Sequence, residues 1–205
     1  MNYFVTAIGT NSGKTLVSAI LCEALEGDYW KPVQAGEPRD SEEIRKLVSN
    51  HSIKIHPERY LLSKPASPHA AAQFDGIQIS LSDFSLPETN RNLIIEGAGG
   101  MLVPLNENNL VVDMIKSFQA EIILVCDLYL GSINHSLLTI EALRSRNLDV
   151  KGIVFNGFGQ RDFEMESMEI ILRKSGFKKL LVMDKEKIIT KDMIKAWATR
   201  IGENL

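Results

Sequence analysis

Short runs of apolar, β-rich sequence alternate along this chain with longer stretches whose apolar residues recur at helical spacing. Most of the short runs are apolar at nearly every position, which is typical of parallel strands buried on both faces of a sheet. Alternation of strand and helix patterns predicts βαβ units, in which each helix packs against the sheet. We therefore predict an α/β fold with a mostly parallel central sheet and helices on both faces.

The predicted elements cover most of the chain. The predicted strands are Tyr3–Ala7, Tyr29–Val33, Leu93–Glu96, Ile122–Cys126, Ile153–Asn156 and Leu180–Val182. The predicted helices are Lys14–Glu26, Ser41–Val48, Leu110–Phe118, Ser132–Arg146, Asp162–Lys174 and Lys191–Ile201. No repeat, linker or low-complexity segment divides the 205 residues, so we predict one domain over residues 1–205.

Composition and charge narrow the classes of function. The formal net charge of −3 argues against an electrostatic nucleic-acid binder. The N-terminus lacks the pattern of a signal peptide, and no apolar run has the length that spans a bilayer. Cys22 and Cys126 have no metal-type spacing, and both are expected to be buried. We expect a cytoplasmic protein without nucleic-acid or membrane partners.

The segment TAIGTNSGKT, residues 6–15, ends in Gly-Lys-Thr, the ending of a phosphate-binding P-loop. It follows a predicted strand and precedes an amphipathic helix, which is the context that such a loop requires. Backbone N–H groups of Thr10–Thr15 and the helix N-terminus are expected to meet phosphate oxygens. Lys14 is predicted to bridge the outer phosphates of a nucleotide, and the Thr15 hydroxyl to bind Mg²⁺.

A carboxylate stands where the metal of such a site needs one. The sequence LIIEGAGG places Glu96 at the end of a predicted strand, before a glycine-rich turn. Ligands of open parallel sheets bind beyond the carboxyl ends of the strands, and P-loop enzymes use an acidic residue there for Mg²⁺. The sequence therefore predicts a site for a nucleotide and Mg²⁺ that includes Thr15 and Glu96.

Five motifs, in this order, resemble the dethiobiotin synthetase family. They are YFVTAIGTNSGKT, YWKPVQAG, SPH, IIEGAGGMLVPL and LGSINHSLLT, and the resemblance runs from Tyr3 to about Asn156. The combination of K-P-V, E-G-A-G-G and G-x-I-N-H is specific, whereas any one of them alone is not. The resemblance implies a P-loop NTPase-like fold and an ATP-dependent carbon–nitrogen ligase of biotin biosynthesis that acts as a homodimer.

The resemblance also implies a reaction. The substrates are 7,8-diaminopelargonate, CO₂ or bicarbonate, and ATP, and the cofactor is Mg²⁺. A carbamate forms on one amine, its oxygen attacks the γ-phosphate, and the second amine displaces phosphate from the resulting carbamic–phosphoric anhydride. Positioning and charge neutralisation are then the main tasks of the protein. The implied catalytic residues are Lys14 and Lys31, with Lys31 stabilising the carbamate and the transferring phosphoryl group.

The family motifs assign further roles by position. The implied nucleotide-binding residues are Thr10, Asn11, Ser12, Gly13, Lys14, Thr15, Leu16 and Asn156, the last of which reads the adenine edge. The implied substrate-binding residues are Ala35, Glu96, Gly97, Ala98, Gly99, Gly131, Ser132 and Asn134, the last three at a helix start that holds the substrate carboxylate across the dimer interface. The implied metal ligands are Thr15, Glu42 and Glu96, with Asp40 as an alternative to Glu42. From the residues alone, Ser132 also fits a helix N-cap and Asn156 a turn before glycine.

The chain departs from the family pattern at several positions. The first glycine of the family loop lies six places before Gly13, where this chain has Ala7. We expect Ala7 to adopt a glycine-like backbone, with Gly9 restoring flexibility. Ala35 replaces a hydroxyl residue that contacts substrate in the family. A G-x-I-P segment near the C-terminus is also missing, so the sequence leaves the nucleotide preference open.

One other class of function shares the P-loop pattern. Nucleotide-switch ATPases of the partitioning or carrier type usually carry an extra lysine early in the loop, as in K-G-G-x-x-G-K. Residues 7–12 of this chain contain no lysine. A cobalamin-type amidotransferase would need a glutaminase domain, for which 205 residues leave no room. The sequence therefore favours the ligase and keeps the switch ATPase as the alternative.

Overall fold

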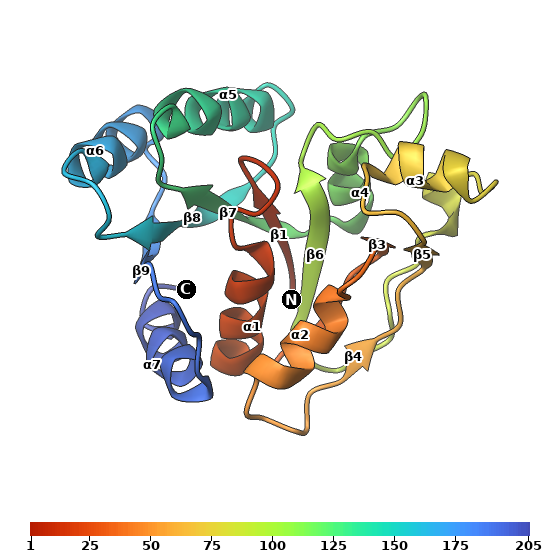
Figure 1. Ribbon diagram of the computed structural model, residues 1–205, viewed down its shortest axis with the longest axis horizontal. Helices are drawn as coiled ribbons and strands as arrows, with labels where there is room; N and C mark the ends of the chain where they lie inside the picture. Colours follow the sequence, from red (N-terminus) through yellow and green to blue (C-terminus); the bar gives the residue numbers. More distant parts are fainter.

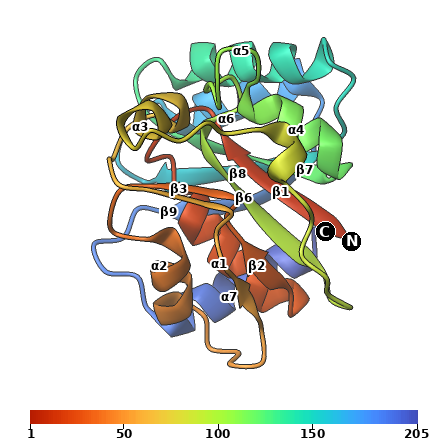
Figure 2. The same cartoon turned by 90° about the vertical axis from the view of Figure 1, so that its right-hand side faces the viewer.

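A computed structural model describes all residues from 1 to 205, and it places one central sheet between two layers of helices (Figures 1 and 2). The strands are β1 (Asn2–Ala7), β2 (Asp28–Trp30), β3 (Val33–Ala35), β4 (Ile55–His56), β5 (Tyr60–Leu62), β6 (Leu93–Gly100), β7 (Glu121–Asp127), β8 (Val150–Phe158) and β9 (Lys179–Asp184). The helices are α1 (Lys14–Leu25), α2 (Asp40–Leu47), α3 (Pro68–Phe74), α4 (Val111–Phe118), α5 (Ser132–Arg144), α6 (Glu164–Ser175) and α7 (Lys191–Gly202), with a 3-10 turn, η1, at Leu81–Asp83.

The main sheet has seven strands in the order β4-β2-β6-β1-β7-β8-β9, and every pair of neighbours is parallel. Strand β1 lies in the middle, between β6 and β7, so the loop that follows it opens at the centre of the carboxyl edge. The predicted α/β fold with a parallel sheet is confirmed. None of the helices has the length and apolar character that crossing a bilayer requires.

Helices cover both faces of the sheet, as predicted. Helices α1, α2 and α7 lie on one face, and α4, α5 and α6 lie on the other (Figure 2). Alternate residues of β7 divide between the two cores: Ile123 and Val125 pack with α1 and α7, whereas Leu124 and Cys126 pack with the opposite layer. Because both faces are buried, the strands need apolar residues at successive positions, and this explains the uniform apolar runs.

The predicted strand over residues 29–33 is wrong in one respect. The structure divides this segment between β2, which pairs with β6 and β4, and β3, which pairs with β5 in a separate two-stranded sheet. Lys31 and Pro32 connect the two. Proline has no N–H for a sheet ladder and restricts the residue before it, so the ladder ends at Trp30. As a result, Lys31 lies at the carboxyl edge of the main sheet, directly after the last residue of β2.

Candidate active site

The loop between β1 and α1 has the backbone geometry of a tight turn. Gly13 is the N-cap of α1 and has a left-handed backbone with φ 97°. A Cβ atom at this position would lie 2.4 Å from the Nδ2 atom of Asn156, so glycine suits the left-handed backbone and also leaves room for the Asn156 side chain. Asn156, at the end of β8, donates from Nδ2 to the carbonyl of Ser12 at 3.0 Å. The predicted adenine reader is thus held against the phosphate loop.

The expected strain at Ala7 is absent. Ala7 is the last residue of β1, is buried, and pairs with Val125 of β7 in ordinary extended backbone. The positive φ angles of the loop fall instead on Asn11, at 60°, and on Gly13. Gly9 does not have a positive φ either. The expectation that Ala7 replaces a conformationally needed glycine is therefore wrong, because the turn begins only after the strand has ended.

Lys14 begins α1 and folds back over the loop. Its Nζ atom donates to the carbonyl of Gly9 at 3.1 Å, and only 7% of the residue is exposed. Burial lowers the pKa of Lys14 to about 8, and the neighbouring Lys31 lowers it too, while the charge of Glu96 opposes the change. The ammonium group forms no ion pair. It lies at the N-terminus of α1, which also favours an anion.

Glu96 is the centre of a buried polar network. It lies in β6 and is 1% exposed. Its Oε1 atom accepts hydrogen bonds from Thr15 Oγ1 and from Lys31 Nζ, both at 2.9 Å. Its Oε2 atom accepts a hydrogen bond from the Tyr29 hydroxyl at 2.9 Å. The structure thus brings together the predicted residues Thr15 from α1, Lys31 from the connection between β2 and β3, and Glu96 from β6.

Lys31 is enclosed by carboxylates. Besides Glu96, its Nζ atom contacts the Oδ2 atom of Asp40, at the start of α2. Burial by itself would lower the pKa of Lys31, but the charges of Glu96 and Asp40 and their hydrogen bonds raise it above its ordinary value. Lys31 is therefore charged at neutral pH, and its pKa is shifted in the direction opposite to that of Lys14.

The acidic residues separate into one that faces the site and one that does not. Asp40 contacts Lys31, whereas Glu42 is exposed and its side chain forms no hydrogen bond or ion pair. Thr15 and Lys31 both contact Glu96, and Asp40 contacts Lys31, so a hydroxyl and two carboxylates belong to one connected group. Mg²⁺ is commonly bound by one or two carboxylates together with water and substrate phosphates. No group of three histidine, cysteine or acidic residues forms a closed metal site. This donor set suits Mg²⁺ shared with a phosphate ligand.

The glycines after β6 allow close packing next to the loop. A Cβ atom at Gly97 would lie 2.8 Å from the Phe4 ring. Gly99 has φ 65°, and its Cβ would lie 2.8 Å from Val103. Ala98 follows Gly97 in the same stretch and is partly exposed. The glycines therefore let the end of β6 pack closely on its neighbours, and a Cβ atom at Gly99 would lie 3.7 Å from Thr10 Oγ1 of the phosphate loop.

One predicted substrate contact, Ala35, lies outside this network. Ala35 ends β3 and is partly exposed, next to Gly36, which has φ 74° and a backbone pressed against Pro65. Its methyl group offers no hydrogen bond, and Gln34 beside it uses its amide on Gly36 and Pro38. Gln34 Oε1 also accepts from the backbone N–H of Asp40, which ties β3 to the start of α2.

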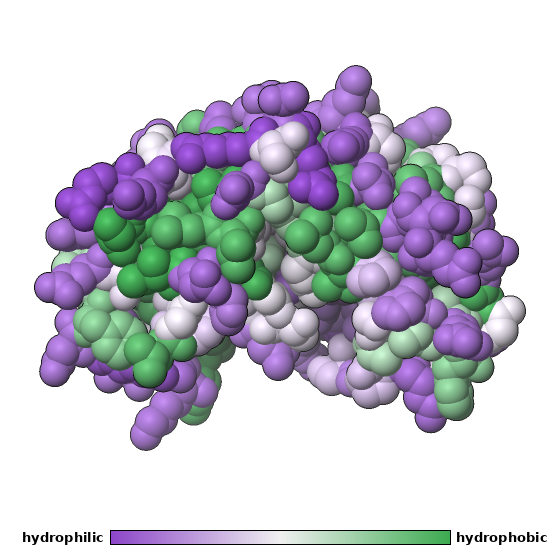
Figure 3. All heavy atoms as spheres, turned by 90° about the horizontal axis from the view of Figure 1, so that it is seen from above, coloured by the Kyte–Doolittle hydropathy of each residue, from purple (hydrophilic) through white to green (hydrophobic).

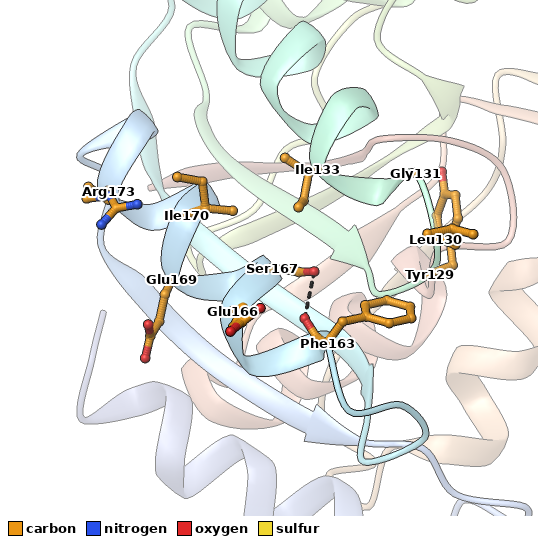
Figure 4. Close-up of a pocket in the computed structure, with 10 residues that line it drawn as sticks. All are labelled: Tyr129, Leu130, Gly131, Ile133, Phe163, Glu166, Ser167, Glu169, Ile170 and Arg173. Atoms are coloured by element: carbon orange, nitrogen blue, oxygen red, sulfur yellow. Dashed lines mark hydrogen bonds between the residues drawn. The ribbon is translucent and has the colours of Figure 1, made fainter.

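The start of α5 lies beside a cavity that is separate from this network. Gly131, with φ 104°, is the N-cap, so the interpretation of Ser132 as the cap is wrong. Ser132 Oγ is buried without a hydrogen-bond partner, and Asn134 is exposed. A cavity of about 560 Å³ lies between this helix start and α6 (Figure 4). It is lined by Tyr129, Leu130, Gly131, Ile133, Phe163, Glu166, Ser167, Glu169, Ile170 and Arg173. None of the lysines or carboxylates of the network lines it.

Sequence reasoning missed one member of the network, Tyr29. Its position inside an apolar run gave it the appearance of a core residue. The only signal was its spacing, two residues before Lys31, which places both side chains on the same side of an extended chain. That signal becomes informative only when the register with Glu96 is known.

A strand, a Gly-Lys-Thr loop that begins a helix, and a carboxylate on the neighbouring strand define a P-loop nucleotide-binding protein. Solved structures with this fold include a putative plasmid partition protein from Borrelia burgdorferi, with a TM-score of 0.60, 12% identity, and coverage of 99% of this chain and 96% of that one. Another is the septum site-determining protein MinD from Pyrococcus horikoshii, with a TM-score of 0.57, 11% identity, and coverage of 100% and 93%. At such identities the likeness shows the fold alone.

Sequence relatives define the family. A family model described as an AAA domain matches residues 1–192. The chain is 57% identical to the ATP-dependent dethiobiotin synthetase BioD of Cytophaga hutchinsonii, over 98% of this chain and 97% of the relative. It is 44% identical to that of Christiangramia forsetii, over 100% and 97%. The chain therefore belongs to the ATP-dependent dethiobiotin synthetase family, which confirms the resemblance drawn from its motifs.

Proposed function

We propose that this chain is a dethiobiotin synthetase, which uses ATP to carboxylate 7,8-diaminopelargonate with CO₂ and to close the cyclic urea of dethiobiotin in biotin biosynthesis. The supporting observation is the network in which Lys31 and Thr15 meet on one oxygen of Glu96, each 2.9 Å away. These three residues stand at matching positions of the family motifs. Membership of the family supports the same reaction.

The two lysines neutralise negative charge on different reacting groups. Lys14, on the phosphate loop, meets the β- and γ-phosphates of ATP. Lys31 meets the carbamate, whose oxygen attacks the γ-phosphate to form the carbamic–phosphoric anhydride and ADP. The second amine then attacks the carbonyl carbon and releases phosphate. Both ammonium groups are buried, and in such an environment preorganised charges stabilise a transition state more than they would in water.

Mg²⁺ would be held by Thr15, Glu96 and Asp40, and it would offset the charge of the transferring phosphoryl group. We assign the second carboxylate to Asp40, although the sequence favoured Glu42, because Asp40 contacts Lys31 and Glu42 does not. Lys31 bridges both carboxylates and keeps them close together. Like charges at this separation would otherwise repel each other.

An activity assay tests the proposed function. The purified protein, incubated with diaminopelargonate, bicarbonate, Mg²⁺ and ATP, should produce dethiobiotin and one ADP for each product, detected by mass spectrometry and a coupled ADP assay. ADP release should depend on the diamine. Absence of dethiobiotin from folded protein that binds nucleotide, with ATP and with other triphosphates, would exclude this function.

The switch ATPase is the competing function. Its only support is the fold that the chain shares with partitioning proteins, and that likeness is at 12% identity for the Borrelia burgdorferi structure. The loop lacks a second lysine between Ala7 and Ser12. Steady ATP hydrolysis without the diamine, rising more steeply than protein concentration, would favour this alternative.

We further propose a homodimer that forms through the surface of α5 and the loop before it. Leu130 is 86% exposed and Leu138 is 56% exposed, which leaves large apolar side chains in water. The face of the molecule that carries α5 and α6 shows apolar surface in two neighbouring areas (Figure 3). A partner on this surface would place the start of its own α5 next to the cavity at Gly131 and Ser132, where the family holds the substrate carboxylate.

The cysteines are buried and free, which fits the cytoplasmic location that we propose.

A further inference from the structure

Tyr29 lies directly behind the proposed metal site. It is completely buried in β2, and its partner in the neighbouring strand β6 is Ile94. Side chains alternate between the faces of a strand, so Ile94 and Glu96 point to the same face, the one covered by α1. A diagonal neighbour two residues along the adjacent strand is within reach of an aromatic side chain. The Tyr29 hydroxyl makes this contact, 2.9 Å from Glu96 Oε2.

The two oxygens of Glu96 have different partners. Oε1 accepts from Thr15 and Lys31, which are the groups that face the proposed ligands. Oε2 accepts from Tyr29 alone. The terminal torsion of a glutamate side chain is broad and nearly two-fold, so the carboxylate plane takes the orientation that its hydrogen-bond partners impose. Tyr29 is fully buried and fixed in β2, so it is a rigid partner of this kind.

We infer that Tyr29 is a positioning residue, which fixes the plane of the Glu96 carboxylate so that Oε1 stays directed at Thr15 and Lys31, where Glu96 would help to hold the Mg²⁺ that binds with the nucleotide. This inference rests on the proposed function, because it assumes that Glu96 serves the metal. Tyr29 itself contacts neither Thr15 nor a ligand through its hydroxyl. Its effect should therefore appear in metal-dependent binding and not in the affinity for the nucleotide alone.

The test is calorimetric titration of ADP into the wild-type protein and into Tyr29→Phe, each with and without Mg²⁺. The phenylalanine ring keeps the packing of β2 against α1 and removes only the hydroxyl. We expect metal-free ADP to bind both proteins with the same affinity within about twofold. The gain in affinity that Mg²⁺ gives should fall about 10-fold in the variant, as is typical when a partner of a metal ligand is removed. Tyr29→Leu, which also removes the hydroxyl, should show the same loss.

Tyr60 offers a matched control. Its hydroxyl also donates to a carboxylate, that of Asp83, but this pair lies in β5 and η1, outside the network. Tyr60→Phe should leave the Mg²⁺-dependent gain unchanged. In a Glu96→Gln background, Tyr29→Phe should cause no further loss, because both changes act through the same carboxylate.

The outcomes separate the inference from the function on which it rests. If Mg²⁺ does not raise the ADP affinity of the wild-type protein, the metal role of Glu96 fails and the inference fails with it. If the wild-type gain is present and Tyr29→Phe keeps it, only the inference fails. An equal loss of affinity with and without Mg²⁺ would also overturn it, since that result would show a general structural role for Tyr29.

Discussion

Lys14 and Lys31 are the two buried cations of the site, and they differ in what holds them. Lys14 contacts only the carbonyl of Gly9, and burial lowers its pKa to about 8. Lys31 lies between Glu96 and Asp40, which keep it charged despite its burial. A bound phosphate would therefore give Lys14 its first ionic partner. Lys31 already has ionic partners, so it would mainly stabilise negative charge that develops beside it during the reaction. This difference predicts different effects of the two alanine variants.

Lys14→Ala should weaken nucleotide binding about 10- to 100-fold, because a hydrogen bond to a charged group contributes about 1.5–3 kcal/mol. Turnover should be abolished, since the same ammonium stabilises the transferring phosphoryl group. Calorimetry with ADP and an assay of dethiobiotin formation measure the two effects. An ADP affinity equal to that of the wild-type protein would contradict the position of Lys14 on the phosphates.

Lys31→Ala should lower kcat by about 100-fold or more, the effect expected when one preorganised charge is removed from a transition state. The affinity for ADP should change only a few-fold, because Lys31 has no contact with the phosphate loop. Steady-state kinetics and calorimetry separate these quantities. Lys46→Ala, which removes an exposed lysine of α2 paired with Glu43, is the control and should change neither. Unchanged turnover in Lys31→Ala would remove Lys31 from its proposed role.

At the scale of elements, the division of the predicted strand at Pro32 shapes this part of the site. Strand β2 stays in the main sheet and presents Tyr29 toward β6, while β3 leaves the sheet and leads to α2 with Asp40. On its other side β2 pairs with the short strand β4, where His56 is opposite Trp30. The Nε2 atom of His56 lies 3.6 Å from the Oδ2 atom of Asp28, and His56 is almost fully buried. The titration of this histidine therefore affects how firmly the outer edge of the sheet is held.

The stability of the protein should fall as the pH decreases through about 6.5, in part because of His56. Burial lowers the pKa of His56 below its ordinary value of 6.5, Lys54 lowers it further, and Asp28 opposes the change. The unfolded chain then binds more protons than the folded one in this range, so the free energy of unfolding decreases with decreasing pH. Urea unfolding at a series of pH values measures the slope.

His56→Gln should flatten this pH dependence between about pH 7 and 5.5, because a glutamine does not titrate there. His51→Gln is the matched control, since His51 is exposed in a loop and its removal should leave the slope unchanged. An identical slope in the wild-type protein and in His56→Gln would show that His56 does not contribute.

At the scale of the whole molecule, the parallel sheet brings the carboxyl ends of β1, β6, β7 and β8 to one edge, and the proposed nucleotide site lies there. The loop before α5 leaves the carboxyl end of β7 at the same edge, and its exposed Leu130 lies next to the cavity between α5 and α6 (Figures 3 and 4). If two copies meet there, the cavity at Gly131 becomes part of an interface. The oligomeric state is therefore a property of the proposed site and not only of the surface.

Light scattering should give the wild-type protein a mass near twice the 22.9 kDa of one chain. Leu138→Asp should shift this mass toward one chain, because a charge placed in an apolar interface loses its hydration. Leu61→Asp changes a leucine of β5 that is 44% exposed and lies away from α5, so it should leave the dimer intact. A monomeric wild-type protein at micromolar concentration would contradict the proposed dimer.

The amino-acid sequence by itself determined the alternation of strands and helices, the phosphate loop and the family. These properties depend on residues close together in the chain: apolar runs mark strands buried on both faces, and Gly-Lys-Thr between a strand and a helix marks the loop. The same reasoning placed Thr15 and Glu96 near one another, because the ends of parallel strands share an edge, and the resemblance to the family added Lys31. It favoured Glu42 over Asp40, which is the acid that contacts Lys31, and it gave Ala7 a backbone that the loop does not need.

Only the tertiary structure decided which side chains touch. The role inferred for Tyr29 depends on its pairing with Ile94, and the contact of Asp40 with Lys31 depends on how β3 leaves the sheet. The Tyr29–Glu96 contact depends on the register of β2 with β6, and a shift of that register by one residue would turn Tyr29 to the opposite face. The Lys31–Asp40 contact depends on the direction in which the chain leaves the sheet at Pro32. Local sequence patterns do not specify such a register, because it results from the packing of the whole sheet against its two layers of helices.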